Sequence, residues 1–311
     1  MKVDPFHKCI LVIGLSHEET EPSEPGALKI HLQSPIKISS FDSASTVVNR
    51  ELAAAVNNNM MFIAGLGEKS DEVWKYHLVS GWIKCGSLVL GRTRHCVAFL
   101  GDILYICGGS TDPDGILDSV EAYNTLSNKC LTAGKLIRGV RNATCISYRN
   151  SIYLFYGFYD ERRTMDDVQV YDTFQNTCTK LNGPNPRPFS PMNTWRAVRW
   201  ETSVILVGRW TCFIFNLEMG TWQERKNLKV DVDYFGLVLD DGIVYVIGGG
   251  VDDIDDDHDD WFWKRGDDVR CIPVDQIIRG NVRSSSWKNV AKLPIPALVY
   301  ACDVVTFPTE Q

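Results

Sequence analysis

Short apolar segments that alternate with polar residues recur along the whole chain, and most of them end at a turn. In the stretch 97–130, a first apolar run leads through a Gly-Asp turn to a second run at 103–107. The pair Gly108 and Gly109, a polar loop and the alternating run 119–123 then follow. Apolar spacing with a period of two between Gly, Asp and Asn turns predicts a four-stranded antiparallel meander. One such sheet exposes both faces and cannot fold alone, so we expect the unit to be repeated.

An apolar run that ends in glycine occurs six times, with a spacing of 40 to 51 residues. These runs end at Gly14, Gly65, Gly108, Gly157, Gly208 and Gly248. In four units an aromatic residue near the end of a third strand is followed, six or seven residues later, by a bulky or thiol residue that opens a fourth strand. These pairs are Tyr76 and Trp82, Tyr123 and Cys130, Tyr171 and Cys178, and Phe215 and Trp222, and Trp287 takes the second role in the last unit after a longer insertion. A repeat of this length indicates the blade of a β-propeller rather than a helical solenoid.

The repeat resembles a known motif. A hydrophobic run, Gly-Gly, a polar loop, the pattern Ser-Val-x-x-Tyr and then a tryptophan resemble the Kelch repeat, most clearly at 94–130 and 238–250. The stretch 167–178 carries the Asp-Val-x-Val-Tyr-Asp part. Gly-Gly is present only in the third and sixth units, and cysteine replaces tryptophan in two. The Gly-His and Trp-Asp dipeptides of a WD40 propeller are missing.

The resemblance and the repeats together predict an all-β fold, a six-bladed β-propeller of four-stranded antiparallel blades that occupies residues 1–311 as a single domain. No first strand precedes the run at Ile10, whereas 297–307 indicates a strand without a blade of its own. We therefore expect the N- and C-terminal strands to pair and close the ring, which removes exposed sheet edges. The expected blades are 8–48 with 297–307, 50–91, 92–140, 141–190, 193–231 and 232–293.

The composition limits which kinds of partner and which cellular location we expect. The 311 residues are 44% hydrophobic, enough for a large core in one closed all-β domain. A net charge of -7 disfavours broad binding of nucleic acid or an anionic membrane. No apolar run approaches the roughly 20 residues that span a bilayer, and the N-terminus lacks a secretory pattern. The ten cysteines form no Cys-x-x-Cys pair. They predict reduced thiols and a cytoplasmic location, with a nuclear location as the alternative.

Candidate chemistry is sparse. The six histidines show no metal-ligand spacing, and no phosphate, dinucleotide or nucleophile motif has the right context, so we expect no cofactor, no metal and no catalysis. The acidic stretch 252–260 resembles a calcium loop when read from Asp253, but His258 and Lys264 stand where Gly and Glu are required. It is predicted to be a solvated loop, with weak binding of a divalent cation as the alternative. The aromatic run 261–263 cannot face inward throughout along a strand, which leaves partner contact or rim packing.

The candidate binding site lies on the loops. The loops after the glycines differ widely although the strands repeat, which is typical of a scaffold that carries a specific site. Arg92 and Arg141 each stand 16 residues before the glycine of their blade, which predicts equivalent places on adjacent blades. Proteins with the Kelch repeat often use an arginine at this position to bind acidic peptides, and the alternative is pairing with rim carboxylates such as Asp118 or Asp166. The predicted partner-binding residues are Arg92, Arg141, Arg162, Arg163, Arg209, Trp210, Trp261, Trp263 and Arg265.

The resemblance implies a non-catalytic module for protein–protein interaction. It is most similar to the substrate-recognition domain of a BTB-Kelch adaptor, which delivers a protein substrate or peptide degron to a cullin-RING ubiquitin ligase. The cullin would bind through a BTB region, which these residues do not contain, and the start at a second strand suggests a domain cut from a longer chain. The alternatives are a cytoskeletal, actin-associated Kelch scaffold, a stand-alone receptor with a different cullin box, and a propeller enzyme. Neither nucleic acid nor a membrane is expected as a partner.

Overall fold

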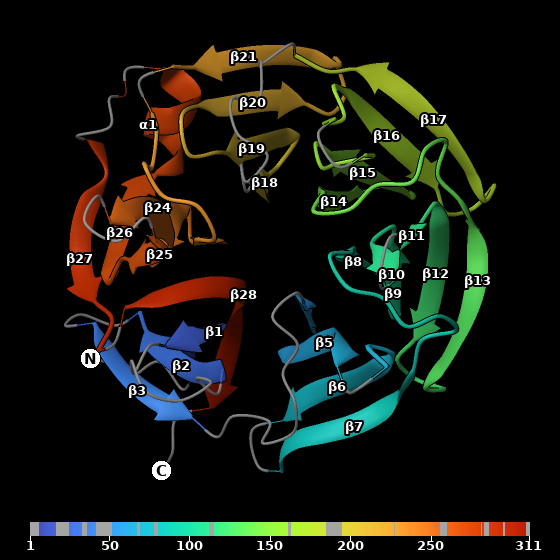
Figure 1. The fold of residues 1–311 in the computed structure, drawn as a ribbon, viewed down its shortest axis with the longest axis horizontal. Coiled ribbons are helices and arrows are strands. Elements are labelled where there is room, and N and C mark those ends of the chain that lie inside the picture. The colour runs from blue at the N-terminus through green and yellow to red at the C-terminus, as the bar shows by residue number, and fades with distance from the viewer. Residues whose placement is uncertain are drawn as a thin grey trace.

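Six four-stranded antiparallel sheets surround a central channel in the computed structural model, so the prediction of a six-bladed propeller is confirmed (Figure 1). The structure describes residues 6–16, 25–32, 36–41, 52–66, 69–77, 80–111, 115–160, 163–184, 195–226, 228–255, 260–280, 282, 286–294 and 296–308. Among these residues, no helix is long and apolar enough to cross a membrane.

Each blade is described from its innermost to its outermost strand. Blade I contains β28 (Ala297–Pro308), β1 (Phe6–Ser16), β2 (Pro25–His31) and β3 (Lys37–Phe41), and blade II contains β4 (Ala53–Asn57), β5 (Met60–Leu66), β6 (Glu72–His77) and β7 (Gly81–Ser87). Blade III contains β8 (Cys96–Leu100), β9 (Ile103–Cys107), β12 (Ser119–Asn124) and β13 (Lys129–Lys135), and blade IV contains β14 (Thr144–Tyr148), β15 (Ser151–Phe155), β16 (Asp167–Asp172) and β17 (Thr177–Asn182). Blade V contains β18 (Arg196–Trp200), β19 (Ser203–Val207), β20 (Cys212–Asn216) and β21 (Thr221–Arg225), and blade VI contains β22 (Gly236–Asp240), β23 (Ile243–Ile247), β26 (Asp268–Pro273) and β27 (Lys288–Lys292).

The two ends of the chain close the ring. Strand β28 is the inner strand of blade I and pairs antiparallel with β1, so that Ile10 lies opposite Val304. The predicted pairing of the N- and C-terminal strands is therefore confirmed. Both strands are strongly apolar, and pairing them hydrogen-bonds backbone groups that would otherwise form two open edges.

The core lies between neighbouring blades. In β9, Leu104 and Ile106 pack with Phe62 of blade II, whereas the intervening Tyr105 packs on the opposite side against the cluster that includes Leu154 of blade IV. Successive residues of a strand point to opposite faces, so one run of alternating large residues fills two interfaces. This explains why the second strands are apolar at almost every position, as expected for strands buried on both faces.

The repeated aromatic residues of the third strands lie opposite the residues that open the fourth strands. Tyr76 pairs with Trp82 across β6 and β7, and their ring centroids are 5.2 Å apart at an angle of 61°. Phe215 and Trp222 form the same cross-strand pair in blade V, with centroids 4.6 Å apart. Edge-to-face and tilted contacts of this kind add stability beyond the buried area. The sequence spacing of six or seven residues is thus the length of the turn between two paired strands.

Three short elements interrupt the repeat. The hairpin of β10 (Ser110–Thr111) and β11 (Gly115–Ile116) projects from blade III, and the hairpin of β24 (Gly250–Asp255) and β25 (Asp260–Arg265) projects from blade VI. The latter corrects the prediction of a solvated loop at 252–260, because the acidic stretch and the aromatic stretch after it pair as two strands. The insertion before Trp287 forms α1 (Val274–Arg279), whose Val274 and Ile277 are buried. Trp287 is buried in the same core cluster as these two residues.

Candidate functional site

Two sets of connections meet at one end of the channel. One set links the outer strand of a blade to the inner strand of the next (88–95 and 136–143), and the other links the second and third strands. Backbone bridges join the two sets, between Thr93 and Ser110 in blade III and between Arg141 and Phe158 in blade IV. Antiparallel strands alternate in direction, so these connections share one face, here named the loop face. The turns between first and second and between third and fourth strands form the opposite face, here named the turn face.

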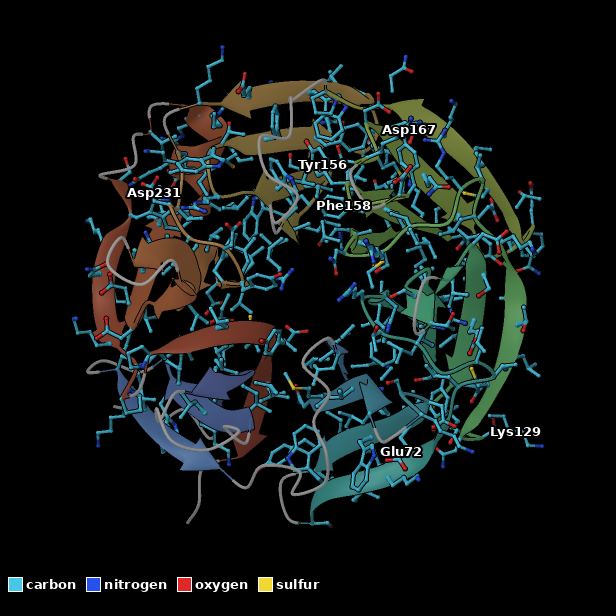
Figure 2. All side chains as sticks on the ribbon, viewed as in Figure 1. Glu72, Lys129, Tyr156, Phe158, Asp167 and Asp231 are labelled. Carbon is cyan, nitrogen blue, oxygen red and sulfur yellow. The ribbon has the colours of Figure 1, made fainter. Side chains whose placement is uncertain are left out.

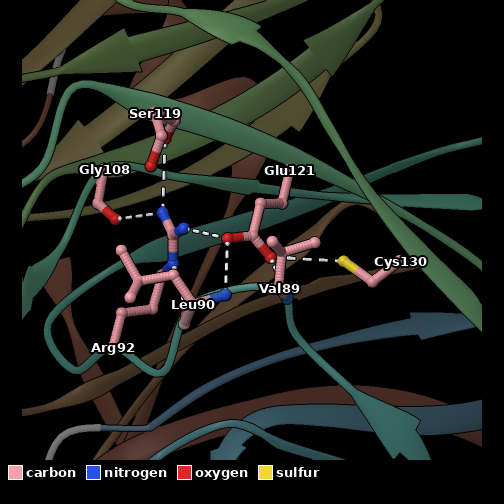
Figure 3. Close-up of polar contacts among 7 residues, drawn as sticks. All are labelled: Val89, Leu90, Arg92, Gly108, Ser119, Glu121 and Cys130. Carbon is pink, nitrogen blue, oxygen red and sulfur yellow. Dashed lines mark hydrogen bonds and ion pairs between the residues drawn. The ribbon is translucent and has the colours of Figure 1, made fainter.

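Arg92 lies at the loop face but is buried, as Figure 3 shows. Its side chain has 0% exposure and forms an ion pair with Glu121, whose side chain is 1% exposed. The Nη1 atom also donates to the carbonyl oxygens of Gly108 at 2.9 Å and Ser119 at 3.3 Å. The Nε atom donates to Leu90 O at 3.2 Å. A guanidinium so enclosed satisfies buried carbonyl groups and cannot reach a partner, which corrects the prediction that Arg92 contacts one.

Glu121 completes this cluster from β12. Its carboxylate accepts hydrogen bonds from the backbone N–H groups of Val89 at 2.8 Å and Leu90 at 3.1 Å, and from the Cys130 thiol at 3.2 Å. The connection 88–95 is therefore held to the third strand of blade III by both backbone and side-chain bonds (Figure 3). In blade IV, Gln169 occupies the same strand position and holds Arg138 by two 2.9 Å bonds to its backbone.

Arg92 and Arg141 are not at equivalent positions, which corrects the prediction from their spacing. The bridges align Arg141 with Thr93, so the counterpart of Arg92 is Val140. The spacing misled because Gly157 corresponds to Gly109 and not to Gly108. The carbonyl oxygens of Gly109 and Gly157 each accept a hydrogen bond from the backbone N–H of the residue two positions before the third strand of the blade. The fourth unit has Tyr156 in place of the first glycine, which shifts the count by one residue.

Two other predicted residues form a cluster between blades V and VI. Arg209 donates to Asp233 at 3.0 Å, and its side chain is 14% exposed while that of Asp233 is fully buried. Its guanidinium also lies over the ring of Trp210, 4.5 Å from the centroid, and Lys229 approaches the same ring at 5.9 Å. Trp210 is 47% exposed, so one exposed aromatic ring lies close to two cations at the loop face.

The remaining predicted residues are less constrained or not described. Arg163 is 71% exposed and lies 3.8 Å from Asp160. Arg141 is half-buried at its bridge to Phe158. Arg162 lies outside the described residues, as do the side chains of Trp261, Trp263 and Arg265. The backbone of the last three belongs to β25, where Trp261 and Trp263 occupy alternate register positions opposite Ile254 and Asp252.

The structure adds three residues that sequence reasoning missed. Arg94, Asn142 and Tyr234 occupy equivalent positions just before their inner strands, and all three have positive φ angles, of 57°, 55° and 51°. They line a cavity of about 620 Å³ that occupies the channel. Each stands 15 residues before the corresponding glycine of its blade (Gly109, Gly157 and Gly249). Counting back from these glycines in the sequence would therefore have identified the three positions. A positive φ is costly for such residues and turns the chain sharply from the connection into the strand.

The connections also present apolar side chains at the loop face. Val89, Leu90 and Ile137 are 57%, 43% and 55% exposed. They lie on the two connections that Glu121 and Gln169 hold, so their backbone is fixed by buried hydrogen bonds. Exposed apolar side chains on a rigid backbone lose little conformational freedom on binding.

Two titratable groups of the channel wall, His95 and Cys302, are uncharged at physiological pH. Burial lowers the pKa of His95 to about 3, so its imidazole is uncharged. Burial, with a smaller effect of Asp303, raises the pKa of the Cys302 thiol to about 12, so it is protonated and a poor nucleophile. All ten cysteines are free. Among the described residues, no group of three or more His, Cys, Asp or Glu side chains could hold a metal ion.

The sequence comparisons with known proteins all find similarity to Kelch proteins. The Kelch motif matches residues 91–136. Kelch-like protein 35 of Mus musculus is 29% identical over 205 residues, which cover 64% of this chain and 34% of that protein. Kelch-like protein 6 of Homo sapiens is 31% identical over 110 residues, 34% of this chain and 17% of that protein. The solved structure of YjhT superimposes with a TM-score of 0.66 at 13% identity, over 82% of this chain and 88% of that chain, which shows the fold alone.

Proposed function

Because the chain is a Kelch-repeat propeller similar to the domains of Kelch-like proteins, we propose that it binds a partner protein on its loop face. The observation that carries this proposal is the combination, on one face, of a polar channel mouth and exposed apolar loop tips on a fixed backbone. Arg94 and Asn142 provide hydrogen-bond donors at the mouth, and Val89, Leu90 and Ile137 provide apolar contacts beside it. A peptide with acidic and apolar residues has the complementary chemistry.

The wider role is that of the substrate-recognition domain of an adaptor for a cullin-RING ubiquitin ligase. The support is the similarity to Kelch-like proteins, of which this chain matches about a third or less. In this proposal a BTB region elsewhere in the protein contacts the cullin, the propeller is non-catalytic, and the complex acts in the cytoplasm. Trp210 and Arg209 contribute to the binding surface, since aromatic and arginine side chains are enriched at binding hot spots.

The partner is sought by affinity purification from cells treated with proteasome and neddylation inhibitors, which retain ligase substrates. A captured protein is then titrated against the parent domain and the double variant Arg94→Ala, Trp210→Ala. Loss of charge-assisted and aromatic contacts should weaken binding by roughly 1–4 kcal/mol, a tenfold to several-hundredfold change in Kd.

The matched control is Lys129→Ala, because Lys129 is exposed at the start of β13 on the turn face. Figure 2 shows Lys129 at the outer edge of the ring. This control should bind like the parent. Equal affinity of the double variant and the parent, with loss of affinity in the control, would place the site on the turn face and refute the proposal.

A further inference from the structure

One side chain breaks the pattern of small residues that opens the channel. In each blade, one residue of the inner strand pairs with the residue that closes the apolar run of the second strand. These six residues are Ala301, Ala53, Cys96, Thr144, Arg196 and Gly236. Five are small and one is an arginine, and all six line the 620 Å³ cavity. Blade V therefore contributes a long cation at a level of the channel where the other blades leave space.

The guanidinium of Arg196 has few protein partners. Among the residues that the structure describes, its one hydrogen bond runs from Nη1 to Trp195 O at 3.3 Å, and it forms no ion pair with a carboxylate. A guanidinium carries five N–H donors, so most of the donors of this half-buried group have no acceptor within the described part of the chain. Burial lowers the pKa of Arg196, which reports the cost of keeping its charge in the channel without an opposite charge.

The surroundings do not supply that opposite charge. Arg94 and Arg199 line the same cavity, so the described wall contains three arginines. Its one carboxylate, Asp303, accepts hydrogen bonds from the backbone N–H groups of Val56 at 2.9 Å and Val304 at 2.8 Å. The channel is thus locally cationic although the whole chain carries a net charge of -7.

We propose that the channel binds a small organic oxyanion, a carboxylate or a phosphate ester, whose oxygen atoms accept hydrogen bonds from Arg196. Arginine recognises both groups through paired N–H donors, and desolvated charge-assisted bonds are the stronger kind. A volume of about 620 Å³ accommodates more than a single inorganic ion and falls within the range of small-molecule sites. This inference goes beyond the binding of a partner protein and does not depend on it.

The test is calorimetric titration of the isolated 311-residue chain with citrate and with inorganic phosphate, at constant ionic strength. The two probes distinguish a carboxylate site from a phosphate site. At least one should bind the parent saturably with one site per chain. Arg196→Met should weaken that binding by about tenfold or more, while Arg196→Lys, which keeps the charge but not the fork of donors, should lie between them.

The control is Arg149→Met, which removes an equal charge from the turn face, where Arg149 is 72% exposed and pairs with Glu218. This variant should bind the probes like the parent, since Arg149 does not line the cavity. Thermal unfolding of each variant identifies any that has not folded, and Arg196→Lys keeps the test valid if Arg196→Met does not fold. The proposal is overturned if the parent binds neither probe, or if Arg196→Met and Arg196→Lys both bind like the parent.

Discussion

His95 is a titratable residue whose place in the channel wall serves packing. It is 5% exposed, and neither ring nitrogen has a hydrogen-bond partner in the part of the chain that the structure describes. Its imidazole lies against Gly65, where an added Cβ would come within 2.8 Å of the His95 Cε1 atom. Gly65 also has a φ of 89°, so the missing side chain and the backbone conformation both require glycine there. The neutral ring therefore occupies a space made for it by a glycine of blade II.

This burial predicts loss of stability in mild acid. The folded pKa is about 3, against about 6.5 in the unfolded chain, so the unfolded state binds more protons below pH 6.5. Stability from His95 is present above pH 6.5 and falls as the pH drops towards 3. At pH 5 the expected loss is about 2 kcal/mol relative to pH 8. Urea unfolding of the parent and of His95→Leu at both values measures it.

The variant lacks the titrating group, so its stability should change less between the two pH values, while carboxylates titrate equally in both proteins. An equal change in the two proteins would show that His95 is accessible to protons in the folded state.

At the scale of elements, the connection between β7 and β8 is held in place by groups of both blade II and blade III. Leu88 and Arg92 donate backbone hydrogen bonds to Asp71 and Ser70 of blade II, while Glu121 binds the same connection from the other side. The connection thus joins two blades and fixes the loop tip at Val89. A part of the loop face depends on the buried pair of Arg92 and Glu121.

Removing one member of this pair should be strongly destabilising. Arg92→Met leaves a buried carboxylate without its cation, and Glu121→Ala leaves a buried guanidinium and two backbone N–H groups unpaired. Each change should lower the free energy of unfolding by about 3–5 kcal/mol. The double variant should lose less than the sum, because no unpaired charge remains. Denaturant unfolding of the three variants measures these differences.

Glu218→Ala is the control, because Glu218 pairs with Arg149 at an exposed site. That pair should contribute no more than about 1 kcal/mol. A loss of similar size for Glu121→Ala would mean that water reaches the Arg92 site.

At the scale of the whole molecule, the ring holds together because each blade packs on two neighbours and the last strand completes the first blade. Strand β28 pairs with β1 over its whole length, with one irregularity at Ile13 and Gly14. Its Val299 and Val305 are buried in two different core clusters, one on each side of blade I. The C-terminal strand is therefore part of two interfaces as well as one sheet.

A chain that ends at residue 296 should lose cooperative unfolding. It lacks the inner strand of blade I and leaves the edge of β1 that pairs with β28 open, which favours aggregation. Differential scanning calorimetry compares it with the full chain and with a chain that ends at residue 308, which keeps all of β28. The control chain that ends at residue 308 should melt like the full chain. Cooperative melting of the 296-residue chain near the parent temperature would contradict a closing role for β28.

The sequence alone determined the repeat, the strands and the closure of the ring. Alternating apolar residues, turn glycines and the pairing of Tyr76 with Trp82 are local patterns, because neighbouring strands of a meander lie close in the sequence. The free strand at the C-terminus predicted the closure because a strand needs a partner. The same patterns predicted which loops share a face, but the hairpin at 250–265 was missed because its acidic strand lacks the usual apolar alternation.

Only the tertiary structure decided which polar residues are buried and which face the channel. Arg92 and Glu121 are 29 residues apart, and nothing local in the sequence shows that they meet without water. A count of residues from a glycine also slips by one where blade IV has Tyr156 in place of the first glycine, so the count aligned Arg141 with Arg92 instead of Thr93. Burial depends on side chains contributed by neighbouring strands and blades. The charged residues of the sequence therefore identified candidates for binding. Packing in the folded protein decided which of these candidates are buried and hold the loops, and which remain accessible to a partner.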